Sequence, residues 1–113
     1  AIMDEAIAER RSAEYDKLAL LRDLQADVAM AFSRYEEADL RVRSFTESLL
    51  PRSRELTDLL LLDYSNGRIR IDEVIRARRR SVDFATRLEE AIYDRNMTVV
   101  ALERLTTRIS NEN

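Results

Sequence analysis

The 113-residue chain contains no cysteine and no histidine, and it has only one glycine and one proline. Without cysteine and histidine it lacks thiol nucleophiles, disulfides, the commonest general base and the commonest metal ligands. We therefore expect no catalytic residues, no metal site and no cofactor, and we interpret the protein as non-enzymatic. The lack of cysteine suits both the cytosol and the periplasm, so it assigns no compartment.

The scarcity of glycine and proline leaves few places where the backbone can reverse. Gly67 lies in the stretch Tyr64-Ser65-Asn66-Gly67, between two segments with helical periodicity. An Asn-Gly pair readily adopts the positive φ angles that end a helix. We predict an all-α fold, a single long antiparallel helical hairpin spanning residues 1–113. Its parts are a helix over about 2–63, a turn over about 64–69 and a helix over about 70–110.

The composition is typical of a coiled coil. Charged residues make up 36% of the chain, aromatic residues make up 6%, and the net charge is -3. Two helices bury only one stripe each, so we expect either a fragment or an oligomer. No apolar run approaches the roughly 18 residues of a membrane-spanning helix, and no signal peptide is recognisable. Because the chain opens within a helical pattern, we expect that a natural N-terminal segment precedes it.

Apolar residues of the first helix recur at heptad spacing. The predicted packing stripe consists of Leu21, Val28, Tyr35, Val42, Leu49 and Leu56 with the companions Leu24, Ala31, Ala38, Phe45 and Leu59. Arg52 is its only break. Pro51 removes a backbone donor and crowds the carbonyl four residues back, so we predict a bend or loosening near residues 46–50.

The second helix repeats the pattern less regularly. Its predicted stripe consists of Ile71, Val74, Ala85, Leu88, Ile92, Val99, Leu102 and Ile109, interrupted by Arg78, Ser81, Arg95 and Thr106. Because this helix is shorter, the first third of helix one has no partner within the chain. We expect something else to cover Leu18, Leu20 and Leu21.

Apolar residues outside these stripes indicate a second packing face. They include Met30, Leu40, Leu50 and Leu61. Helices with two apolar stripes lie inside a sheet or barrel of helices, whereas a wide core face in a small bundle gives the same pattern. Periodicity does not separate these two possibilities.

Several short motifs occur in a characteristic order. They are Leu49-Leu50-Pro51, Tyr64 with Gly67, Val74-Ile75-Arg76-Ala77-Arg78-Arg79, and Leu102 to Leu105 with Thr106. In this order and spacing the chain resembles the periplasmic helical hairpin of TolC-like outer-membrane efflux proteins. That family has Leu-Leu-Pro, Tyr-x-x-Gly, a run such as Leu-Leu-Asp-Ala-Gln-Arg, and Leu-x-x-Leu-Thr-Gly. Arg76 and Arg78 replace the family's Asp and Gln.

The resemblance implies a function as well as a fold. The hairpin would be a fragment of an α-barrel duct, located in the periplasm, in a homotrimer that contacts the outer membrane only through barrel strands outside this chain. Its tip would contact a periplasmic adaptor that links it to an inner-membrane pump. The tip residues are Tyr64, Ser65, Asn66, Gly67, Arg68, Ile69 and Arg70. Asp72, Glu73 and Arg76 would line and gate the tunnel entrance.

Each of these features also has a purely structural interpretation. Tyr-x-x-Gly is common at helix ends, and Asp72 and Glu73 are ordinary partners of a helix dipole. The main alternative function is a generic coiled-coil arm that binds a protein or a nucleic acid through its arginine-rich tip. No aromatic residues alternate with the arginines to stack on bases, so we expect no nucleic-acid partner. A single lysine, Lys17, argues against a membrane-remodelling hairpin.

Overall fold

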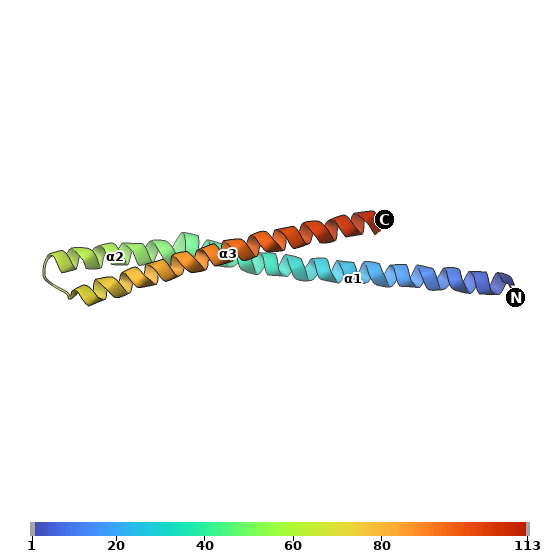
Figure 1. The fold of residues 1–113 in the computed structure, drawn as a ribbon, viewed down its shortest axis with the longest axis horizontal. Helices are drawn as coiled ribbons and strands as arrows, with labels where there is room; N and C mark the ends of the chain where they lie inside the picture. The colour runs from blue at the N-terminus through green and yellow to red at the C-terminus, as the bar shows by residue number, and fades with distance from the viewer. Residues whose placement is uncertain (1, 113) are drawn as a thin grey trace. The chain divides into compact units, whose positions relative to one another are not determined.

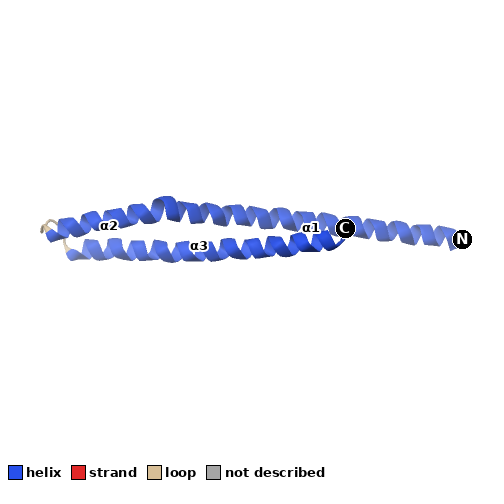
Figure 2. Ribbon diagram, turned by 90° about the horizontal axis from the view of Figure 1, so that it is seen from above, coloured by secondary structure: helices blue, strands red, loops and turns tan. Residues whose placement is uncertain are grey.

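The computed structural model describes the backbone of residues 2–112 and the side chains of residues 2–111, and it is helical except at residues 66–70 (Figure 2). The elements are α1 (Ile2–Ser44), a π-helical segment η1 (Phe45–Leu49), α2 (Leu50–Ser65) and α3 (Ile71–Glu112). The predicted all-helical fold is confirmed. The first helical stretch ends two residues later than predicted, and the second ends at Glu112.

The chain divides into two compact units, of which one is Tyr35–Met97 and the other contains the remaining described residues. Within Tyr35–Met97, α2 runs beside the first half of α3 and the two are joined by the turn at residues 66–70 (Figure 1). This unit is a helical hairpin. Its buried side chains are mostly small, which lets the two backbones approach closely. They are Ala38, Val42, Leu50, Ser53, Val74, Ala77 and Ala91.

The π-helical segment interrupts the first arm of this hairpin. The backbone N–H of Leu50 donates to the carbonyl of Phe45, five residues back instead of four. Pro51 follows at once, and it has no N–H and crowds the carbonyl of the preceding turn. The wider π turn accommodates the proline without breaking the helix. The loosening predicted near residues 46–50 is therefore confirmed, and it takes the form of one extra residue in the turn.

That extra residue changes which face of α2 meets α3. The side chains of Leu50 and Ser53 are buried, and Thr57 and Leu60 are half-buried. The sequence-based stripe was wrong beyond Phe45, because its members Leu49, Leu56 and Leu59 are 39%, 44% and 57% exposed. Arg52 is exposed and is not a break in the contact. One residue corresponds to a rotation of about 100° about the helix axis, which turns the leucines outward.

On α3, half of the predicted stripe is correct. Val74 is buried, and Ser81, Leu88, Arg95, Leu102 and Ile109 are half-buried at the same heptad position. The companion positions were wrong. They are occupied by Ala77, Phe84, Ala91, Thr98 and Leu105.

The companion residues predicted on α3 lie on its outer or flanking surface. Ile71 and Val99 are exposed, and Ala85 and Ile92 are half-buried at the edge of the contact. The exposed residues Arg78 and Thr106 do not interrupt it. Apolar side chains also occupy positions next to the contact, so periodicity alone did not distinguish the predicted companion positions from the observed ones.

The second unit pairs part of α1 with the end of α3. On α1, Leu24 and Ala31 are buried and Leu21 and Val28 are half-buried. A helix surface residue becomes inaccessible only when another element covers it, and the C-terminal part of α3 supplies that cover. All side chains from residue 2 to residue 20 are exposed. The expectation that the first third of α1 lacks a partner within the chain is confirmed for these residues, although Leu21 is partly covered.

The residues assigned to a second packing face divide into two groups. Leu50 belongs to the core of the hairpin, so that part of the assignment was wrong. Met30, Leu40 and Leu61 are exposed. None of the helices in residues 2–112 combines the length and the apolar character that crossing a membrane requires.

Candidate functional site: the hairpin tip and the polar contacts behind it

The hairpin tip is a Schellman turn built on Gly67. Gly67 has φ 73°, the left-handed conformation that glycine adopts without strain from a side chain. Its N–H donates to the carbonyl of Tyr64 (3.0 Å), and the N–H of Arg68 donates to the carbonyl of Asp63 (2.9 Å). These are the two hydrogen bonds that define the motif at a helix C-terminus. The sequence therefore predicted the reversal point correctly.

Charges replace the apolar contact that often accompanies this motif. Nη1 of Arg68 lies 3.8 Å from Oδ1 of Asp63. The same two residues are joined by the backbone hydrogen bond of the Schellman motif. Nη2 of Arg70 lies 3.8 Å from Oδ2 of Asp72 at the start of α3. Both arginine side chains are well exposed, so these pairs contribute little to stability. They do place positive and negative charge side by side at the tip.

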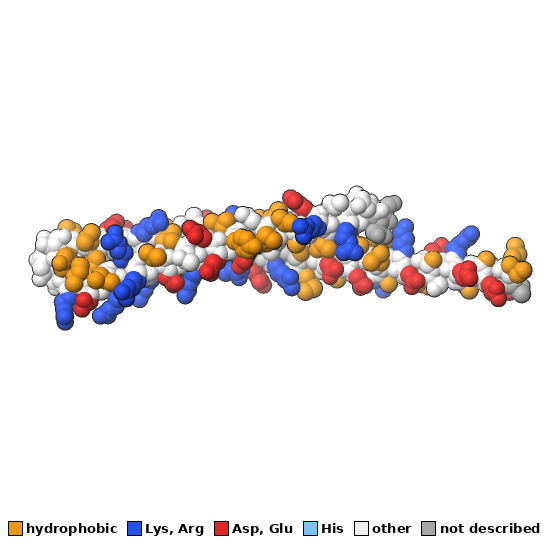
Figure 3. Space-filling model, in the orientation of Figure 1, with side chains coloured by type: hydrophobic (Ala, Val, Ile, Leu, Met, Phe, Trp, Pro, Cys, Tyr) orange, Lys and Arg blue, Asp and Glu red, His pale blue; other side chains and the backbone are white. Residues whose placement is uncertain are grey.

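Most of the predicted tip residues present their side chains to solvent. Tyr64 is 42% exposed and only Ile69 is half-buried. The hydroxyl of Ser65 donates to the carbonyl of Leu61 (2.9 Å), one turn back in α2. Hydrophobic and basic side chains gather on the surface of the tip end of the hairpin (Figure 3). The tip thus offers an aromatic ring and guanidinium groups on a backbone that the Schellman bonds hold in one conformation.

The predicted gate residues lie in the first two turns of α3. Asp72 and Glu73 occupy the first turn, where negative charge is favoured by the unpaired N–H groups. The N–H of Glu73 donates to the carbonyl of Arg70 (3.2 Å). Asp72, Glu73 and Arg76 are all exposed. Among the described residues Asp72 is paired with Arg70, and Arg76 forms no ion pair with either carboxylate.

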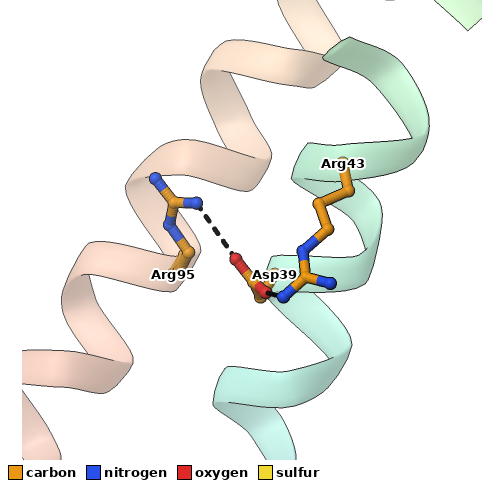
Figure 4. Close-up of polar contacts among 3 residues, drawn as sticks. All are labelled: Asp39, Arg43 and Arg95. Carbon is orange, nitrogen blue, oxygen red and sulfur yellow. Dashed lines mark hydrogen bonds and ion pairs between the residues drawn. The ribbon is translucent and has the colours of Figure 1, made fainter. Parts of the chain in front are cut away.

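A half-buried ion pair that the sequence analysis did not assign lies farther along the hairpin. Nη1 of Arg95 donates to Oδ1 of Asp39 at 3.1 Å, and Nη2 of Arg43 lies 2.6 Å from Oδ2 of the same carboxylate (Figure 4). The side chain of Asp39 is 15% exposed. The hydrogen bond from Arg95 is the main cause that lowers the pKa of Asp39. Burial opposes it, and the charge and hydrogen bond of Arg43 add to it.

A hydroxyl cluster links α2 to α3 nearer the tip. Oγ of Ser53 and Oγ of Ser81 are 2.7 Å apart, and Oγ1 of Thr57 lies 3.3 Å from Oγ of Ser81. Thr57 donates to the carbonyl of Ser53 at 2.8 Å. Because the hydroxyl proton of Thr57 is used in this bond, Thr57 accepts a hydrogen bond from the hydroxyl of Ser81. The hydroxyl of Ser81 in turn accepts a hydrogen bond from that of Ser53. Every hydroxyl of the cluster has a partner, and this arrangement holds the two helices at one register.

No known protein family, curated protein or solved structure matches this chain. Assignment of a function therefore depends on the chain's own geometry. In residues 2–112 no group of three or more acidic side chains is placed to hold a metal ion. A shallow groove of about 370 Å³ lies over the hydroxyl cluster. Its lining residues are Arg54, Thr57, Asp58, Arg78, Ser81, Val82 and Ala85.

The polar contacts behind the tip were missed for an identifiable reason. Ser81 and Arg95 appeared as interruptions of an apolar stripe, and polar residues at such positions give no indication of their partners. Asp39 and Ser53 lay off the predicted stripe. Their spacing of 14 residues on α1 and α2 matches that of Arg95 and Ser81 on α3 in the reverse direction. Separations of two heptads occur at many positions, so this match does not by itself identify the partners.

Proposed function

We propose that this chain is a periplasmic duct segment of an outer-membrane efflux or secretion channel. In this proposal the hairpin tip contacts a periplasmic adaptor, which connects the duct to an inner-membrane pump. The segment conducts passively and carries out no chemistry of its own. Three protomers would pack side by side through the apolar side chains that the hairpin leaves exposed. Contact with the membrane would belong to barrel strands outside this chain.

The observation that carries this proposal is the construction of the tip. A helical hairpin closed by a Schellman turn presents Tyr64, Arg68 and Arg70 at its end, on a backbone fixed by two hydrogen bonds. Aromatic and arginine side chains are enriched among the residues that carry binding energy in protein interfaces. Pairing of both arginines with nearby carboxylates lowers the positive potential of the tip, which favours a protein over a nucleic acid as the partner.

The first turns of α3 suit the role of an entrance. Asp72 and Glu73 are exposed carboxylates that would attract cations or pair with an arginine of a neighbouring protomer. Arg76 lies one turn farther on and is free to make such a pair, because no described acidic side chain of its own hairpin engages it. A ring of such pairs between protomers would hold the entrance closed.

Cysteine cross-linking in the intact envelope protein tests this proposal. Ser65→Cys introduces a thiol at the exposed tip, and these 113 residues contain no other cysteine. Glu89→Cys, on the exposed surface of α3, is the matched control. A short bifunctional reagent is applied to cells that also produce the adaptor with an epitope tag.

The proposal predicts an adduct with the periplasmic adaptor that forms with Ser65→Cys and not with Glu89→Cys. Cross-links to cytosolic proteins alone would contradict the duct assignment and favour the generic coiled-coil arm. Equal adducts at the two positions would contradict the role of the tip.

A further inference from the structure

Helix α2 carries two different faces that fit a packing stripe. The face now in contact with α3 contains Leu50, Ser53, Thr57 and Leu60. The adjacent face, one residue away, contains Leu49, Arg52, Leu56 and Leu59. The second face continues the heptad pattern of α1 with Arg52 as its one charged member, and it contains three leucines where the first has two.

The structure uses the face that carries two hydroxyl groups and no charge. Hydrogen bonds among Ser53, Thr57 and Ser81 compensate for the hydroxyl groups that enter the contact. Leu49, Leu56 and Leu59 remain exposed as a result. The three leucines of the adjacent face would gain more from leaving water than serine and threonine do, whereas burial of the charged Arg52 on that face would carry a cost.

The π turn and Pro51 explain the choice. If the helix kept α geometry through residues 45–51, the ring of Pro51 would clash with the carbonyl of Glu47, four residues back. The bond from Leu50 to Phe45 lengthens that turn by one residue and relieves the clash. It also rotates everything after it by about 100°. The backbone constraint at one residue therefore sets the orientation of the whole of α2.

We infer that α2 is a two-register element, in which the π turn at Phe45–Leu49 is the pivot and Pro51 holds the hydroxyl face against α3 and the leucine face outward. Migration or loss of the π turn would rotate α2 by one residue and exchange the two faces. The exposed leucines would then be buried within the hairpin and the hydroxyls would face out. The inference concerns the hairpin itself and does not depend on the proposed function.

Disulfide mapping in the purified chain distinguishes the two registers. In one variant, Ser53→Cys with Ser81→Cys, the two sulfur atoms replace oxygens that are 2.7 Å apart, within easy reach of a disulfide. In the other, Arg52→Cys with Ser81→Cys, a bond forms only after α2 rotates by one residue. Each pair is oxidised with and without Pro51→Ala. Glu55→Ala, an exposed substitution in α2 that keeps the proline, is the control for Pro51→Ala.

With Pro51 present we expect the 53–81 disulfide and little of the 52–81 disulfide. Pro51→Ala is expected to raise the ratio of the 52–81 to the 53–81 yield by about tenfold or more, as for a shift between two populated states. Glu55→Ala should leave the ratio unchanged. An unchanged ratio in Pro51→Ala would overturn the inference, as would loss of both disulfides in that variant.

A deletion provides the reverse test. Removing Thr46, an exposed residue of the π turn, from the Pro51→Ala chain takes out the extra residue while keeping α geometry. The hydroxyl face then falls in phase with the stripe of α1, so the 53–81 disulfide should return. Continued formation of the 52–81 disulfide in the deletion variant would show that the residue count of the turn does not control the register, and would overturn the inference.

Discussion

The first arm of the hairpin has two parts, one before and one after the π turn. Both pack against α3, but they use different positions of the heptad pattern. Before the turn, Ala38, Val42 and Phe45 follow the heptad pattern of the sequence, and Phe45 approaches Phe84 with ring centroids 6.0 Å apart. After it, the contact shifts by one residue to Leu50 and Ser53. The buried positions therefore move by one residue across the π turn.

The two parts also differ in their polar contacts. The part before the turn uses an ion pair between Asp39 and Arg95, and the part after it uses neutral hydroxyl groups. Each contact joins polar side chains of α3 to polar side chains of the facing arm. Polar groups of this kind specify a register more strictly than leucines do, because a shift by one residue breaks their directional contacts across the hairpin.

The largest expected effect separates two adjacent leucines. Leu50→Ala removes a side chain that is 6% exposed and is expected to lower the free energy of unfolding by about 2–4 kcal/mol. Leu49→Ala removes one that is 39% exposed and should cost less than about 1 kcal/mol. Urea unfolding of both variants measures the difference. Equal losses, or a greater loss for Leu49→Ala, would mean that the contact after the π turn is not displaced by one residue.

A smaller effect is expected at the turn that closes the second part. In Gly67→Ala an added Cβ would meet no atom within 4 Å, so only the backbone conformation with φ 73° opposes it. A non-glycine residue in this conformation costs about 1–2 kcal/mol. Thermal unfolding followed by circular dichroism should show a lower Tm. Gly67→Asn, which tolerates the left-handed region better, should recover part of the loss.

The hydroxyl cluster offers a test within the second part alone. Ser81→Ala removes the group that Ser53 and Thr57 share and is expected to cost about 0.5–1.5 kcal/mol. Adding Ser53→Ala should cost little more, because the hydroxyl that Ser81→Ala leaves unpaired is then removed as well. Ser33→Ala, at an exposed position, is the control. Strictly additive losses in the double variant would show that the two serines are not coupled.

The smallest expected effect is the pH dependence of the stability that Asp39 contributes in the part of the arm before the π turn. Because Arg95 lowers the pKa of Asp39 in the folded state below its ordinary value of 3.8, the carboxylate adds stability at pH values above that value. This contribution is lost as the pH falls through the lowered pKa. Wild type should therefore be more stable than Asp39→Asn at pH 7, and the difference should shrink below about pH 4. Unfolding curves of both proteins across this range measure it, and a constant difference would contradict the pairing.

The parts of the fold that depend on local chemistry could be predicted from the sequence. Because Gly67 is the only glycine, the reversal of the chain could be predicted there, and Pro51 predicted a loosened helical turn. The form of that turn was not predictable, because relief of the proline clash by one extra residue or by a bend leaves the same sequence signal. Heptad periodicity therefore could not show which face of α2 contacts α3, or which residues of α3 take the companion positions.

The candidate site likewise contains residues that the sequence could predict and residues that it could not. The position of the tip followed from Gly67, and most of the tip side chains are exposed. The ion pair of Asp39 with Arg95 required knowledge of which residues lie opposite each other across the hairpin. That alignment follows from the turn and the register together, and the register was wrong after Phe45.

The most direct test of the one-residue shift is a single-cysteine accessibility scan over residues 49–60. The chain has no native cysteine, so each variant carries one thiol, and its rate of reaction with a maleimide reports exposure. We expect slow reaction for Ser53→Cys and Thr57→Cys and fast reaction for Leu56→Cys and Leu59→Cys. Fast reaction at 53 and 57 with protection at 56 and 59 would contradict this expectation, because the heptad pattern of α1 would then continue unbroken through Pro51.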